Sequence, residues 1–120
     1  MKKAGLVIAL FFLMGMVSTF AQEVQSGSFS ASSASQNYTL ASGTGDRTYS
    51  IEVSFPKGFD VKPDIILSVS LLESDKSANL RYDVVAKSVS RDGFMITIKT
   101  WGDTKIYAIG GSWLAVSAGK

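Results

Sequence analysis

The sequence predicts an all-β domain, a six-stranded antiparallel β-sandwich. Apolar and polar residues alternate with a period of two in five separate runs, as they do in strands that bury one face. Short segments rich in Gly, Pro, Asn, Asp and Ser separate the runs and supply the turns. No helical spacing of apolar residues competes with this pattern. Five clear runs and a weaker first one, at this spacing, are typical of a β-sandwich or barrel.

The first three strands are predicted in the N-terminal half of the domain. The first is weak, because Val24, Phe29 and Ala31 are the apolar residues of a serine-rich stretch. A loop, 40–47, follows by composition. The second strand alternates over 49–55 and ends at Pro56, and the third covers 65–72.

The last three strands follow a polar loop at 73–79. Alternation over 81–90 predicts the fourth strand, and Arg91-Asp92-Gly93 predicts a tight hairpin turn after it. The stretch 93–116 reads as a second hairpin, in which two strands flank the turn 101–104. In this stretch we expect Phe94, Ile96, Ile98 and Trp113 to lie in the core.

The first 21 residues read as a secretory signal peptide. Lys2 and Lys3 precede an apolar run over 4–17, and Thr19 and Ala21 are small residues at the positions that signal peptidase reads. The run is shorter than a membrane span, and an uncleaved anchor is the alternative. We therefore predict a secreted protein, periplasmic or extracellular. Its domain is residues 22–120, with no membrane insertion after cleavage.

Composition excludes several classes of function. Without Lys2 and Lys3, ten basic residues balance ten acidic ones, so no basic stripe remains for nucleic acid. The chain has no Cys and no His, which excludes Ser-His-Asp and Cys-His catalysis and the usual zinc sites. We expect no cofactor and no metal.

Several motifs, in order and in spacing, resemble the H-type lectin domain. The resemblance covers essentially the whole of residues 22–120, and its clearest parts are Asn79-Leu80-Arg81, Gly93-Phe94, 100–107 and 112–115. The family includes a snail agglutinin that binds N-acetylgalactosamine and the C-terminal domain of discoidins. It implies a six-stranded antiparallel sandwich assembled as a trimer or a dimer of trimers. It also implies a site for galactose- or N-acetylgalactosamine-type glycans between protomers.

The resemblance also implies the site residues. Arg81 stands where the family uses an Arg to hydrogen-bond sugar hydroxyls, which suits the fixed fork of a guanidinium. Trp101 and Tyr107 match aromatic positions that line the sugar pocket. The alternatives for Arg81 are a surface arginine on a strand edge or an ion pair with Asp83 or Asp103, and for the aromatic residues they are packing roles in the sandwich or between subunits.

The neighbouring protomer supplies an acidic loop residue in the family. Asp46 is the carboxylate in the corresponding loop, and Gly43 or Gly45 allows close approach of the backbone. The alternative for Asp46 is pairing with Arg47. Gly102 replaces a polar sugar contact of the snail lectin, so one side-chain hydrogen bond is missing.

Three functions compete at this point. The first is a non-catalytic lectin with the six site residues above. The second is a structural or oligomerisation module with a degenerate sugar site, which Gly102 and a short 43–47 loop would explain. The third is a glycosidase, which needs two carboxylates across a cleft, and nothing in the sequence places Asp46 and Asp103 in that arrangement.

Overall fold

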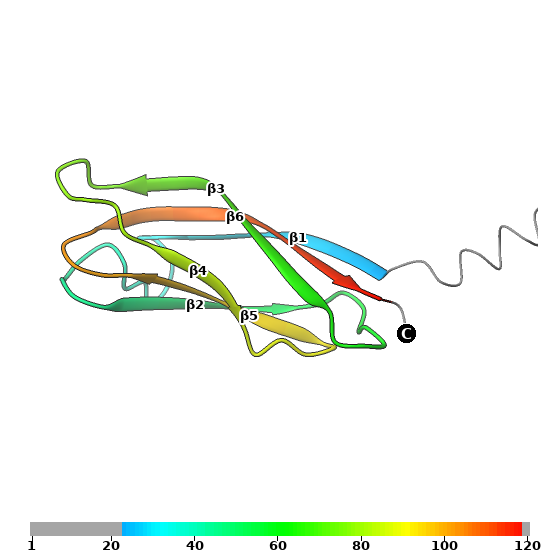
Figure 1. The fold of residues 1–120 in the computed structure, drawn as a ribbon. Helices are drawn as coiled ribbons and strands as arrows, with labels where there is room; N and C mark the ends of the chain where they lie inside the picture. Colours follow the sequence, from blue (N-terminus) through cyan, green and yellow to red (C-terminus); the bar gives the residue numbers. More distant parts are fainter. Residues whose placement is uncertain (1–22, 119–120) are drawn as a thin grey trace, which may run out of the picture.

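Residues 23–118 are described by the computed structural model, and the predicted signal peptide at 1–21 lies outside this range. They form six strands in two three-stranded antiparallel sheets that face each other (Figure 1). The strands are β1 (Glu23–Ser32), β2 (Arg47–Ser54), β3 (Asp64–Ser74), β4 (Asp83–Lys87), β5 (Gly93–Thr100) and β6 (Ile106–Ser117). The predicted antiparallel β-sandwich is therefore confirmed. Within this range the structure has no helix long and apolar enough to span a membrane.

The predicted hairpin over 93–116 is wrong. The sheets have the orders β1-β6-β3 and β2-β5-β4, so β5 and β6 are the central strands of opposite sheets and do not pair with each other. The turn between them carries the chain from one sheet to the other at one end of the sandwich (Figure 1). Each strand is apolar enough to be flanked on both sides, and local alternation says nothing about which partner flanks it.

The fourth strand is shorter than predicted. The strand was predicted over 81–90, but β4 covers only Asp83–Lys87. It pairs with β5, with Asp83 opposite Lys99 and Lys87 opposite Met95. The connection therefore begins at Ser88, which has a positive φ of 53°. The pairing of β4 with β5 confirms that this connection closes a hairpin.

Aromatic residues from both sheets fill the core. Trp113 of β6 contacts Phe94 of β5 edge to face, with ring centroids 5.5 Å apart, and Phe55 lies 5.7 Å from both rings. Gly27, opposite Trp113 in the β1–β6 register, makes room for the indole, because a Cβ there would lie 2.6 Å from the ring. The predicted core residues are buried, as are the other members of the cluster: Phe29, Ala31, Leu40, Phe59, Ile106, Ile109 and Ala115.

The pairing of β3 with β6 shifts its register at two points. Val69 pairs with Gly111 and Leu71 with Gly110, so Ser70 is the extra residue of β3. Only glycine fits at position 111, because the Cβ of any other residue would lie 1.8 Å from the Ser68 carbonyl oxygen.

The second shift makes Tyr107 the extra residue of β6. Glu73 pairs with Ala108 and Ser74 with Ile106, so Tyr107 has no direct partner on β3. Tyr107 is 42% exposed between two buried residues, Ile106 and Ala108, as ordinary alternation along a strand predicts. The alternation is broken after it, since Ala108 and Ile109 are both buried.

Candidate functional site

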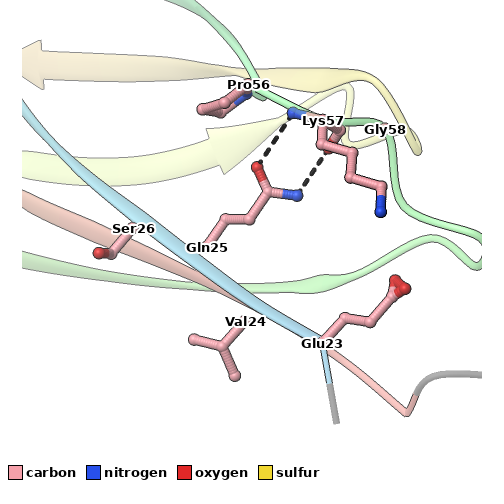
Figure 2. A pocket seen from close by; sticks show the side chains of 7 residues that line it. All are labelled: Glu23, Val24, Gln25, Ser26, Pro56, Lys57 and Gly58. Atoms are coloured by element: carbon pink, nitrogen blue, oxygen red, sulfur yellow. Dashed lines mark hydrogen bonds between the residues drawn. The ribbon is translucent and has the colours of Figure 1, made fainter.

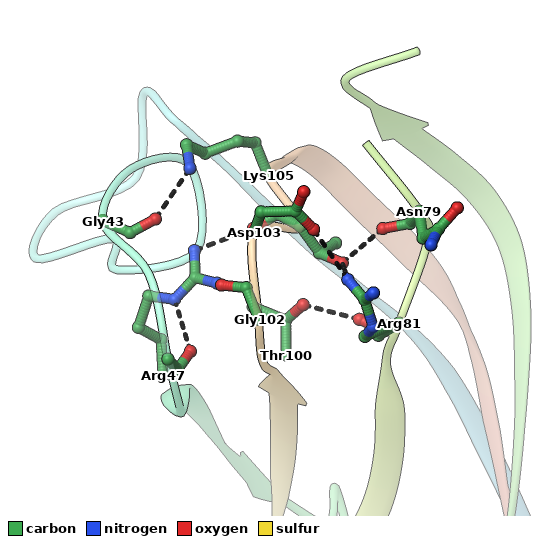
Figure 3. Close-up of polar contacts among 10 residues, drawn as sticks. Gly43, Arg47, Asn79, Arg81, Thr100, Gly102, Asp103 and Lys105 are labelled. Carbon is green, nitrogen blue, oxygen red and sulfur yellow. Dashed lines mark hydrogen bonds and ion pairs between the residues drawn. The ribbon is translucent and has the colours of Figure 1, made fainter. Parts of the chain in front are cut away.

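Three segments meet at the end of the sandwich where the chain crosses from β5 to β6. They are the crossing turn 101–105, the segment 79–82 before β4, and the loop 41–46 before β2 (Figure 3). All but one of the predicted site residues lie in these segments. The exception is Tyr107, which lies just inside β6.

Arg81 is held against the crossing turn. Its Nη1 donates to Asp103 Oδ1 at 2.7 Å and, more weakly, to Thr104 Oγ1 at 3.4 Å. The segment itself is anchored by two threonine hydroxyls of the β5–turn region, since Thr100 donates to the Arg81 carbonyl and Thr104 to the Asn79 carbonyl (Figure 3). Within residues 23–118 Arg81 Nε and Nη2 have no hydrogen-bond partner, and no unpaired side-chain nitrogen there is buried, so both donors are accessible to solvent.

The Arg81 ion pair controls the charge of Asp103. The hydrogen bond from the guanidinium holds the pKa of that carboxyl below its ordinary value, and the nearby Lys105 adds to the effect. Asp103 is therefore a fixed anion at neutral pH. A glycosidase acid needs the opposite shift, so Asp103 is unsuited to that role.

Gly102 lies directly beneath the Arg81 guanidinium. It has a positive φ of 68°, and a Cβ there would lie 2.9 Å from Arg81 Nη1 and 3.2 Å from its Cζ. A side chain at this position would be strained in its backbone and would displace the guanidinium. The glycine that the sequence marks as a missing contact is thus the surface on which Arg81 rests.

Asp46 and Trp101 line one cleft of about 460 Å³, together with Tyr82, Asp83 and Lys99. The Lys99 ammonium lies 3.5 Å from Asp46 Oδ2 and 5.9 Å from the centroid of the Trp101 ring. Asp46 does not pair with Arg47, the alternative partner, and its side chain is 74% exposed. Trp101, at 37% exposed, is no part of the sandwich core.

The six predicted residues thus occupy three places within one chain. Arg81 lies over Gly102, Asp46 and Trp101 share the cleft, with Gly45 directly before Asp46 in sequence, and Tyr107 is not among the residues that line the cleft.

One residue of this region was missed by the sequence analysis. Arg47 donates to the carbonyl oxygens of Gly45, Ser42, Thr104 and Gly102 at 2.8–3.0 Å, and so joins the loop 41–46 to the crossing turn. All four acceptors are main-chain atoms, so no complementary side chain in the sequence could have revealed the contact.

Other concave surfaces exist away from this end. A cleft of about 500 Å³ lies at the opposite end, where Gln25 of β1 bonds the main chain of Lys57 through both atoms of its amide (Figure 2). Its lining has no aromatic side chain, and its carboxylate, Glu23, is at the very start of β1. Within residues 23–118, no three His, Cys, Asp or Glu residues are grouped to hold a metal ion.

Comparisons with known proteins agree with the observed fold. The model of the H-type lectin domain matches residues 50–116. Two structures of discoidin II from Dictyostelium discoideum superpose with TM-scores of 0.72 and 0.73, at 27% and 26% identity, and cover 80% and 81% of this chain. A phage tailspike, from Pseudomonas phage phi297, shares the fold at a TM-score of 0.52 and 15% identity over 80% of this chain.

A sequence relative is similar over a shorter span. The protein "ATP synthase subunits region ORF 7" of Fuscovulum blasticum is 37% identical over 76 residues, which is 63% of this chain. The chain spans 66% of that relative's length and 37% of each discoidin II chain.

Proposed function

This chain belongs to the H-type lectin domain family, and we propose that it binds galactose- or N-acetylgalactosamine-type glycans at sites completed between the protomers of a trimer. A lectin binds carbohydrate without transforming it, so the proposed role is non-catalytic. The leader-like residues 1–21 support secretion to the periplasm or outside the cell.

One observation carries the proposal: a carboxylate, an aromatic face and an outward-facing guanidinium lie at the same end of the sandwich. The carboxylate of Asp46 accepts hydrogen bonds from adjacent hydroxyls, and the ring of Trp101 packs on the C–H face of a pyranose. The free Nε and Nη2 of Arg81 donate to sugar oxygens while Nη1 stays bound to Asp103.

The separation of the predicted residues supports a site shared between chains. Tyr107 stands outside the cleft that contains Asp46 and Trp101. A second copy packed against this end would bring an Asp46-bearing loop to the Arg81 and Tyr107 of its neighbour. Three or more such sites on one particle would raise a weak affinity for a single sugar into useful avidity.

A glycan array with the purified protein tests the proposal. We expect binding to glycans that end in galactose or N-acetylgalactosamine, and a trimer or dimer of trimers by light scattering. Arg81→Ala is expected to lose binding, whereas Arg91→Ala, an exposed arginine beyond β4, is expected to retain it. A blank array at high protein density would refute the proposal.

The second candidate is a structural module without sugar binding. It is favoured by the ion pair of Arg81 with Asp103, which already uses part of the guanidinium. It predicts the same oligomer with a blank array, and identical behaviour of Arg81→Ala and the wild type.

A further inference from the structure

The side chain of Arg47 donates to four main-chain carbonyl oxygens. Its Nε donates to the Gly45 carbonyl at 2.9 Å, and its Nη1 donates to the carbonyls of Ser42 at 3.0 Å and Thr104 at 2.8 Å. Nη2 donates to the Gly102 carbonyl at 2.9 Å (Figure 3). Neither of the two ion pairs found in residues 23–118 involves Arg47, so all of its recorded bonds are to the main chain.

The loop that Arg47 holds has little else to order it. Residues 42–46 are exposed, and two of them, Gly43 and Gly45, have positive φ values of 79° and 78°. Besides Arg47, two contacts tie this loop to the crossing turn: Gly45 N donates to the Gly102 carbonyl at 2.9 Å, and Lys105 Nζ donates to the Gly43 carbonyl at 2.7 Å. A glycine-rich loop without these bonds would lose its fixed conformation, because backbone entropy favours many others.

Gly102 links the loop 41–46 to Arg81. The Gly102 carbonyl receives Arg47 and the Gly45 amide, while the Cα of Gly102 supports the guanidinium of Arg81. Asp46, which directly precedes Arg47, is thereby held against the crossing turn of its own chain, so its carboxylate is presented to a neighbouring protomer in one conformation. A carboxylate that must meet sugar hydroxyls in a fixed geometry gains affinity from such preorganisation.

We propose that Arg47 is a positioning residue for carbohydrate binding: it does not contact the sugar, but it fixes the Asp46 loop to the Gly102 turn. The inference rests on the function proposed above. It assigns a role in binding to a residue whose own side chain faces only main-chain carbonyls.

Three variants test this role. Arg47→Gln removes the cationic fork, Arg47→Lys keeps the charge with fewer fixed donors, and Lys105→Met removes the second side-chain tether of the same loop. Arg91→Lys is the matched control, since Arg91 is an exposed arginine in a different connection. Each protein is first compared with the wild type by circular dichroism and thermal unfolding, and only folded variants are compared in binding, well below their Tm.

Binding is measured by surface plasmon resonance on albumin conjugated with N-acetylgalactosamine or with galactose. We expect Arg47→Gln to weaken the Kd by about tenfold, the cost of reordering one or two groups on binding, with Arg47→Lys in between and Arg91→Lys unchanged. Amide hydrogen exchange gives a reading independent of sugar: the Gly45 N–H is expected to exchange faster in Arg47→Gln.

The outcomes separate the two proposals. A wild-type protein that binds neither conjugate overturns the proposed function and this inference with it. A wild-type protein that binds, together with an Arg47→Gln variant of equal affinity, overturns the role of Arg47 alone. Should Arg47→Gln fail to fold, Lys105→Met decides: faster exchange at Gly45 with weaker binding supports the coupling of loop and site, and faster exchange with unchanged affinity overturns it.

Discussion

Replacing Gly102 with alanine tests whether the crossing turn supports Arg81. An L-residue at a φ of 68° costs about 1–2 kcal/mol of folding free energy, because Cβ crowds the carbonyl. The new Cβ would also stand 2.9 Å from Arg81 Nη1, so the guanidinium must leave its position. Forcing a side chain off its rotamer adds about 0.5–1.5 kcal/mol. We therefore expect Gly102→Ala to destabilise the protein by about 1.5–3.5 kcal/mol.

The chain provides a matched control for the backbone term. Gly45 has a nearly identical φ of 78°, but a Cβ there would meet nothing within 4 Å. Gly45→Ala should therefore cost only the strain, about 1–2 kcal/mol. The difference between the two variants isolates the displacement of Arg81.

Urea denaturation, with the free energy of unfolding extrapolated to water, is the assay. In an Arg81→Ala background the cost of Gly102→Ala should fall to that of Gly45→Ala, which gives a coupling of about 1 kcal/mol between residues 81 and 102. Equal costs for the two glycine substitutions in the wild-type background would refute the reasoning. So would a cost at Gly102 that Arg81→Ala leaves unchanged.

Further predictions concern charge, a buried hydroxyl and the core. Arg81 lowers the pKa of Asp103, so the stability that this pair contributes is present above the ordinary pKa of 3.8 and is lost as acid protonates the carboxylate. Unfolding of Asp103→Asn should therefore depend less on pH below about 4 than unfolding of the wild type. Acid titration followed by circular dichroism measures this difference. The Tyr38 hydroxyl donates to the Ile106 carbonyl at 2.8 Å, and burial raises the pKa of Tyr38 to about 12. The contribution of this hydroxyl to the free energy of unfolding should be complete up to about pH 10 and decrease as the pH rises towards 12. Tyr38→Phe should be about 1 kcal/mol less stable in urea and should not show this decrease. Gly27→Ala would place a methyl group 2.6 Å from the Trp113 indole and should cost about 1–3 kcal/mol in the same urea assay, and Ser28→Ala, which changes the exposed neighbour, should stay within about 0.5 kcal/mol of the wild type.

The sequence predicted the strands of this fold well and their pairing less well. Phe94, Ile96, Ile98 and Trp113 are buried as expected, because the alternation of apolar and polar residues marks the buried face of a strand. The same alternation misled at 93–116, where the two strands lie in different sheets. The alternation of apolar and polar residues predicts which side chains face the core, but it does not predict which strand pairs with which.

The surroundings of the candidate residues could be predicted only in part. Trp101 lies outside the core, and Tyr107 is exposed, as the alternation of Ile106, Tyr107 and Ala108 along β6 requires. The contact between Gly102 and Arg81 requires a positive φ together with a segment 20 residues away, and neither can be read from a glycine in a turn. Arg47 was missed because its partners are main-chain carbonyls, which every residue carries.

Those main-chain partners have a consequence for how the site can change. Since Arg47 recognises the path of the loop and no loop side chain, substitutions at Thr44 and Asp46 leave its four acceptors in place. Thr44 and Asp46 are also the loop positions without a positive φ between Gly43 and Arg47, so they accept most side chains. A designed library at these two positions would therefore test the proposed contact of Asp46 with sugar while the backbone that holds the loop stays unchanged.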